Sequence, residues 1–115
     1  MQNNNGVVYF ITSQQLGISE PGPGTNLMDN YINALSQQSE IPSAILLVNT
    51  GVMLAASDSN VLDSLKHLAE KGCDILLCGM CVNYYELSDK IAVGRISNML
   101  EISGILTSAS RSVTL

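Results

Sequence analysis

Apolar and polar positions alternate in blocks along the chain, and the blocks predict strands that alternate with helices. Short continuous apolar runs are typical of strands buried on both faces, and an apolar stripe at helical spacing is typical of a helix packed on one face. The apolar runs predict strands at 7–11, 44–48, 74–77, 91–93 and near Val113. The stripes predict helices at about 27–37, 61–71, 84–88 and 99–108.

Polar residues mark the ends of these helices. At four predicted helix starts an asparagine stands three residues before an acid, so that it would cap an amide while the acid complements the helix dipole. The four asparagines are Asn26, Asn60, Asn83 and Asn98. Gly72 follows the second helix and suits a left-handed stop.

The alternation of strands and helices predicts an α/β fold with a mainly parallel sheet and helices on both faces. With 115 residues, the chain predicts one domain over 1–115, a three-layer sandwich around five strands. Hydrophobic residues make up 46% of the chain and charged residues 13%. This balance favours a buried sheet, an oligomer interface, or both.

Charge and hydropathy narrow the function classes. The net charge of -5 argues against nucleic acid as a partner, because such binding rests on basic residues. No apolar run approaches the ~20 residues of a membrane span. Residues 1–6 lack the basic and apolar regions of a signal peptide. We therefore expect a cytoplasmic protein without a membrane partner, whose three cysteines are largely reduced.

The strongest chemical signal is a Cys-Gly-Met-Cys motif at the end of the third predicted strand. Cys78 ends the apolar run and Cys81 follows within one turn. Because reactive groups of α/β sheets gather at the carboxyl ends of strands, this placement favours thiol chemistry. Amides of the turn would stabilise a thiolate, so we expect a moderately acidic thiol. The candidate substrate-binding residues lie in this turn and at the neighbouring strand end: Gly79, Asn83, Asn49 and Thr50.

Other interpretations of the cysteines stay open. Apolar packing is the preferred interpretation of Cys73. A zinc site needs four ligands, whereas the chain has one CxxC motif, and we expect His67 to be a solvated helix side chain. A thioredoxin-type dithiol is the sharper alternative, although all three prolines precede the motif. No cofactor is predicted, since the glycine-rich segment 21–25 lacks the lysine of a phosphate-binding loop.

Four segments of the second half of the chain are ordered and spaced as in a known family. They are Asn49-Thr-Gly-Val52, Ile75-Leu-Leu-Cys78-Gly-Met-Cys81-Val-Asn-Tyr-Tyr85, Lys90-Ile-Ala-Val-Gly94 and Ile96-Ser-Asn-Met99. On these residues the chain resembles the C-terminal domain of YedF-type selenium-metabolism proteins, within the DsrE/DsrF-like sulfurtransferase family. YedF-type chains usually carry an N-terminal TusA-like domain, to which nothing in this sequence corresponds.

The resemblance implies a DsrE-like sandwich, usually found as homo- or hetero-oligomers. It also implies that Cys78 carries sulfur as a persulfide, with Cys81 as a resolving or second carrier thiol. We thus expect a sulfur or selenium carrier, a possible sulfurtransferase, that works with donor and acceptor proteins such as a TusA-like protein. Its transfer should be lost in Cys78→Ser and less damaged in Cys81→Ser. A non-catalytic subunit of a sulfur-relay hetero-oligomer and a CxxC dithiol redox protein are the alternatives.

Overall fold

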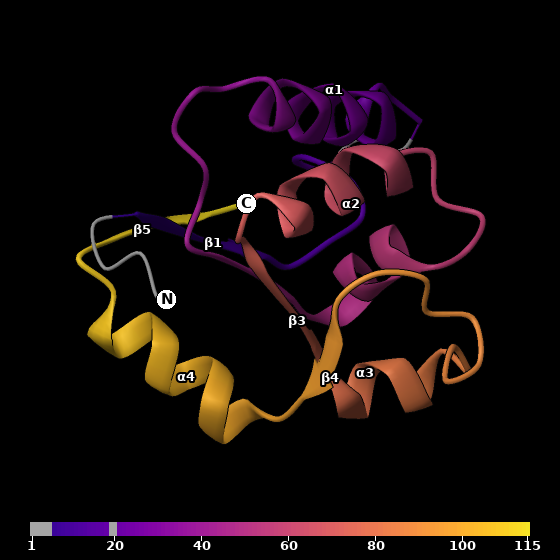
Figure 1. The fold of residues 1–115 in the computed structure, drawn as a ribbon. Coiled ribbons are helices and arrows are strands. Elements are labelled where there is room, and N and C mark those ends of the chain that lie inside the picture. Colours follow the sequence, from indigo (N-terminus) through magenta and orange to yellow (C-terminus); the bar gives the residue numbers. More distant parts are fainter. Residues whose placement is uncertain (1–5, 19–20) are drawn as a thin grey trace.

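A five-stranded parallel sheet forms the centre of the molecule (Figure 1). In the computed structural model, which describes residues 6–18 and 21–115, the strand order is β4-β3-β2-β1-β5. The strands are Val7–Ile11 (β1), Ala44–Leu47 (β2), Asp74–Cys78 (β3), Arg95–Ser97 (β4) and Arg111–Thr114 (β5). The predicted α/β class is confirmed, with every neighbouring pair of strands parallel.

Helices cover the two faces of the sheet unequally. The α-helices are Gly24–Ser36 (α1), Leu62–Glu70 (α2), Gly79–Tyr84 (α3) and Met99–Ser108 (α4), and a 3-10 helix spans Asn49–Ala55 (η1). The long helices α1 and α2 lie on one face and α4 lies on the other, while α3 lies at the end of β3 beside β4 (Figure 1). In the described part of the chain, no helix combines the length and the apolar character needed to cross a bilayer.

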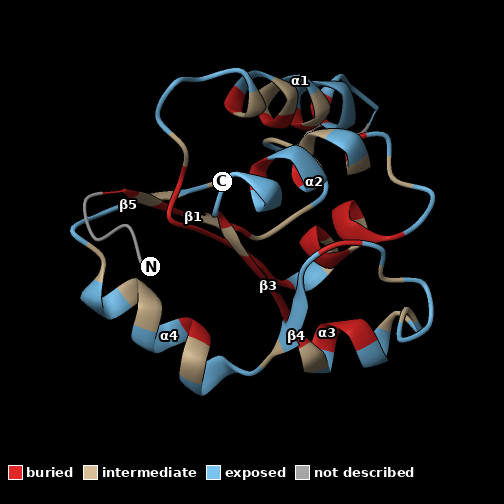
Figure 2. Ribbon diagram, viewed as in Figure 1, coloured by how far each residue is buried: buried red, intermediate tan, exposed pale blue. Residues whose placement is uncertain are grey.

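The core lies in the middle of the sheet. Every residue of β2 is buried, as are the last four residues of β3. The helices α1 and α2 cover one face of these strands with four fully buried side chains, Met28, Ile32, Leu65 and Leu68. Figure 2 shows that β4 and most of α4 are by contrast exposed. Ile102 is the buried residue of α4. The edge formed by β4 and the start of α4 is therefore little covered, as is the other edge strand, β5.

Only one of the four predicted asparagine caps is confirmed. The Asn98 side chain accepts a hydrogen bond from the Glu101 amide at 2.9 Å, at the start of α4. Asn26 lies inside α1, which begins after Pro23. Asn60 lies two residues before the start of α2, and its side chain contacts Asp29 of α1. At these two starts the asparagine side chain does not cap the helix.

The predicted helix at 84–88 and the predicted strand at 91–93 are wrong. The helix begins earlier because the CxxC motif itself forms its first turn, which places Asn83 inside α3 and not at its start. The apolar segment 91–93 instead pairs with the end of η1, through an Ile91–Ala56 bridge and an Ala92 amide bonded to Ala55 at 2.9 Å. The fourth strand follows Gly94, whose φ of 83° turns the chain back onto β3.

An ion cluster fixes β4 against its neighbours. The Arg95 guanidinium donates to both carboxylate oxygens of Asp74 in β3 at 3.0 and 3.1 Å, and to both oxygens of Glu101 in α4 at 2.8 and 3.1 Å. Ser97 also bonds to Glu101. A short polar edge strand is thus held by charge where apolar burial is small. The segment 1–5, where the sequence predicts no signal peptide, lies outside the described residues, as do 19–20 in the loop after β1.

Candidate functional site

The carboxyl ends of β1, β2 and β3 bring three segments together. These strands are parallel neighbours, so the segments that follow them lie along the same edge of the sheet. After β2 the 3-10 helix η1 begins at Asn49, and β3 passes from Cys78 directly into α3. This is the edge at which open α/β sheets bind ligands.

Both thiols of the CxxC motif are placed by the junction of β3 and α3. Cys78 has an extended backbone and is both the last strand residue and the residue before α3, while Cys81 lies in the first turn of that helix. Gly79 suits this abrupt start, because a Cβ there would lie only 3.0 Å from the Ser97 carbonyl oxygen of β4. With glycine at this position, α3 begins close against β4.

A backbone amide from the neighbouring loop is directed at the second thiol. The Asn49 N–H donates to the Cys81 Sγ at 3.1 Å. Asn49 has a φ of 55°, in the left-handed region that few residue types other than glycine and asparagine occupy readily. Its side-chain oxygen accepts a hydrogen bond from the Tyr85 hydroxyl at 3.3 Å, which joins the loop to the end of α3.

The surroundings act on the Cys81 thiol in opposite directions. Burial raises its pKa above the ordinary value, the Asn49 amide lowers it, and the neighbouring Cys78 thiol raises it. The net direction is upward, whereas the sequence predicts a moderately acidic thiol in this turn. The pKa of Cys73 is also raised: burial and the charge of Asp74 bring it to about 12. Its predicted role as a packed core residue is confirmed by its burial.

A shallow hollow opens onto Cys81. It has a volume of about 340 Å³ and is lined by Asn49, Met80, Cys81, Tyr84 and Tyr85. Met80 and Tyr84 are 76% and 77% exposed, so they form a raised apolar rim. The rings of Tyr84 and Tyr85 meet edge to face with centroids 5.0 Å apart.

The structure brings together three of the six predicted site residues. The Asn49 amide bonds to Cys81, and Cys78 lies close enough to Cys81 to raise its pKa. The other three face elsewhere: Thr50 contacts Ser13 and the Gln14 amide, Gly79 packs on β4, and Asn83 accepts a hydrogen bond from Ser88. The chemical signal missed from the sequence is the amide of Asn49, a backbone group that its side chain does not reveal.

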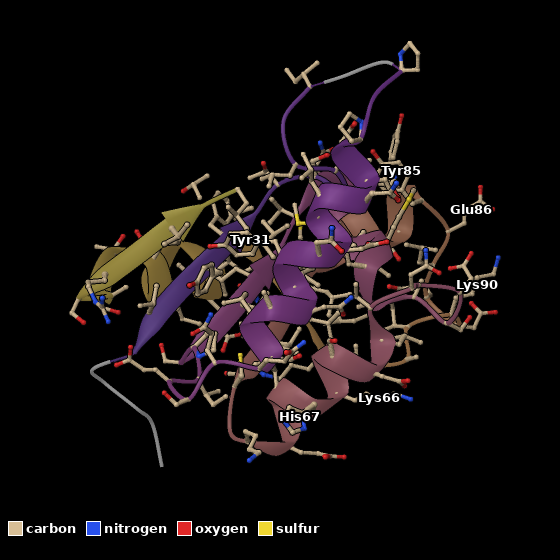
Figure 3. The ribbon with its side chains drawn as sticks, turned by 90° about the horizontal axis from the view of Figure 1, so that it is seen from above. Tyr31, Lys66, His67, Tyr85, Glu86 and Lys90 are labelled. Atoms are coloured by element: carbon tan, nitrogen blue, oxygen red, sulfur yellow. The ribbon has the colours of Figure 1, made fainter. Side chains whose placement is uncertain are left out.

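The lone histidine lies away from this site. His67 is exposed on α2, and Figure 3 shows it beside Lys66 and well separated from Tyr85. Its predicted role as a solvated helix side chain is confirmed. Among the described residues, no group of three or more histidine, cysteine or acidic side chains is arranged to hold a metal ion. All three cysteines are free thiols.

The fold is similar to several solved structures. The ychN protein of E. coli matches with a TM-score of 0.72 and 18% identity, covering 100% of both chains. The protein MTH1491 of Methanobacterium thermoautotrophicum matches with a TM-score of 0.64 and 17% identity over 95% of this chain and 97% of that one. The protein BT1422 of Bacteroides thetaiotaomicron matches with a TM-score of 0.66 and 15% identity over 96% of each chain. MTH1491 and BT1422 are each described as a protein of unknown function.

Sequence comparison is more specific than the fold. No curated protein matches the chain significantly. A family model does, over residues 25–115, which include both thiols of the motif and the loop that contacts them. The chain therefore belongs to the DsrE/DsrF-like family, a family of the sulfur-relay type.

Proposed function

We propose that this protein is a carrier of sulfane sulfur, or of selenium in the same oxidation state, and that the Cys78–Cys81 pair holds the cargo. The observation that carries the proposal is the pair itself: two reduced thiols in contact at a strand end, one of them bonded to an amide and open to a hollow. The YedF-type resemblance makes selenium a candidate beside sulfur.

The chemistry is a persulfide exchange. A thiolate of the motif attacks the outer sulfur of a donor persulfide, the sulfur–sulfur bond of the donor breaks, and the donor leaves as a thiolate that takes up a proton. The protein then holds a hydropersulfide, which an acceptor thiolate removes by the same step in reverse. No external oxidant or reductant is consumed.

Apolar side chains around the site support a role for protein partners. Most of the exposed large apolar residues of the described chain come from α3, β4 and the start of α4: Met80, Tyr84, Ile96, Met99 and Leu100. Exposed apolar groups that gather on one side are typical of an interaction surface. We propose that donor or acceptor proteins, such as a TusA-like protein, or further subunits of an oligomer contact this side.

Intact mass measurement tests the carrier function. The reduced protein is exposed to glutathione persulfide, desalted and weighed, with and without a final reduction step. We expect one added sulfur atom that reductant removes, and no addition in the double variant Cys78→Ser/Cys81→Ser. The control is Cys73→Ala, which keeps both motif thiols and should take up sulfur as the wild type does. A wild-type protein with titratable thiols and no added sulfur would overturn the proposal.

A non-catalytic subunit is the second candidate, and the exposed apolar side favours it equally. In that case the protein would take up no sulfur and would co-elute with a related subunit as one complex in size-exclusion chromatography. Substitution of Leu100, which is 85% exposed, by Ser should then weaken the complex without affecting the fold.

A further inference from the structure

We propose that sulfur arrives at Cys81 and then passes inward to Cys78, so that Cys81 is the receiving thiol and Cys78 the storage thiol. This inference rests on the proposed carrier function and assigns an order to its two thiols. It gives Cys81 the first step, whereas the sequence ranks Cys78 ahead of it.

Access is the first observation. Cys81 is 9% exposed and lines the hollow, while Cys78 is 3% exposed and is not among the lining residues. An in-line attack on a donor persulfide needs free space in front of the attacking sulfur. Cys81 lies at that space, whereas Cys78 is more deeply buried and does not line the hollow.

The amide of Asn49 is the second observation. A sulfur atom that becomes negative, as thiolate or as persulfide anion, is a stronger hydrogen-bond acceptor than a thiol. The Asn49 N–H already points at the Cys81 Sγ at 3.1 Å, from a left-handed backbone conformation that costs free energy. The donor is thus preorganised at the sulfur where charge appears during uptake and release.

The contact between the thiols supplies the second step. The two thiols stand three residues apart across the junction of β3 and α3, close enough for Cys78 to raise the pKa of Cys81. The Cys78 thiol gives up its proton and, as a thiolate, attacks the outer sulfur of the Cys81 persulfide. A new sulfur–sulfur bond forms at Cys78, the sulfur–sulfur bond at Cys81 breaks, and Cys81 leaves as a thiolate within reach of the Asn49 amide. This thiolate takes up the proton that Cys78 released, so that atoms and charge balance.

Single-cysteine variants test the order. In a Cys73→Ala background, Cys78→Ser and Cys81→Ser are exposed to glutathione persulfide, quenched with iodoacetamide at short times and mapped by peptide mass spectrometry. In Cys78→Ser we expect the sulfur to be found on Cys81 and to remain there, because the storage thiol is absent. Cys81→Ser should lose rapid uptake, because the remaining thiol is covered.

A second measurement does not depend on these substitutions. In the parent protein, fragment ions of the peptide that holds both thiols should place the sulfur on Cys81 at the earliest times and on Cys78 later. Rapid uptake in Cys81→Ser, or an initial label on Cys78, would overturn the order of steps and leave the carrier function intact. Absence of uptake in the parent itself would overturn the carrier function, and the inference with it.

Discussion

The conformation of Asn49 should control the reactivity of Cys81, and two substitutions at this one position separate the cause from side effects. Asn49→Gly keeps the backbone N–H and tolerates a φ of 55°, so it loses only the side-chain contact with Tyr85. Asn49→Val places a β-branched residue where the left-handed region is strongly disfavoured. The valine variant should therefore turn the amide away from the Cys81 Sγ.

The size of the effect follows from the hydrogen bond. A hydrogen bond to a charged group is worth about 1.5–3 kcal/mol, which corresponds to a rise of roughly one to two units in the thiol pKa when the bond is lost. Burial already raises the pKa of Cys81, so the thiolate fraction at neutral pH would fall by about 10- to 100-fold. Because nucleophilicity rises with basicity and offsets roughly half of this on a logarithmic scale, the observed rate should fall about 3- to 10-fold.

The assay is the rate of alkylation by iodoacetamide as a function of pH, in a Cys73→Ala/Cys78→Ser background in which Cys81 is the one thiol. The valine variant should show a pH profile shifted upward, and the glycine variant should match the parent. Circular dichroism and thermal melting establish that both variants are folded. A folded valine variant with the parent profile, or a glycine variant shifted as far as the valine one, would refute the role of the amide.

Three further predictions concern stability and the remaining groups. Gly79→Ala should lower the free energy of unfolding by about 1–3 kcal/mol because the added Cβ would lie 3.0 Å from a carbonyl oxygen of β4, and thermal melting measures this. Its control is Gly104→Ala in α4, where nothing lies within 4 Å and helix propensity should stabilise by about 0.5–1 kcal/mol; equal effects at the two positions would contradict the close approach. Hydrogen bonds from Arg95 hold the pKa of Glu101 at about 2, below its ordinary 4.5, so its contribution to stability is complete above pH 4.5 and disappears as the pH falls toward 2. Denaturant titrations of Glu101→Gln over this range should give a flatter pH dependence than the wild type, and parallel curves would argue against the ion cluster. Burial raises the pKa of Cys73 to about 12, so Cys73 should be alkylated more slowly than the other two thiols at pH 8. In urea, which unfolds the protein, the three alkylation rates should be equal. Fast alkylation of Cys73 in the folded protein would be inconsistent with its burial.

Elements whose apolar pattern meets a clear boundary signal were predicted well from the sequence. The first strand at Val7–Ile11 and the last helix at Met99–Ser108 have the predicted bounds. A polar loop follows this strand, and the Asn98 cap precedes this helix. The third strand, which ends without such a signal, is one residue longer than predicted and ends at Cys78.

Elements that depend on a distant partner were not predictable in this way. The strand Arg95–Ser97 has little apolar character and is held by the carboxylates of Asp74 and Glu101, which approach it only in the folded chain. The helix Gly79–Tyr84 follows β3 directly, without polar residues between them. From the sequence its first residue, Gly79, suggests a turn, whereas in the structure this glycine lies close to the backbone of β4. Propensity is a weak signal where such tertiary contacts decide the outcome.

For the site, the sequence identified the thiols but not the group that acts on them. Cys78 and Cys81 follow an apolar run, which is a visible pattern, whereas the Asn49 amide belongs to the backbone. The available signal is an asparagine directly after a buried strand, since asparagine tolerates the left-handed conformation better than most residues. Thr50 is the next polar residue after the same strand, yet its hydroxyl oxygen accepts a hydrogen bond from the Gln14 amide in the loop after β1. Adjacent polar residues at a strand end can therefore have unrelated roles.

The raised pKa of Cys81 also bears on how the pair would hold a sulfur atom. In thiol exchange, a sulfur with a low pKa leaves quickly and one with a high pKa leaves slowly. Burial raises the pKa of Cys81. A persulfide on Cys81 should accordingly be released slowly to bulk thiols, and faster to the neighbouring thiol of the same motif. These properties suit the retention and directed transfer of a sulfur atom.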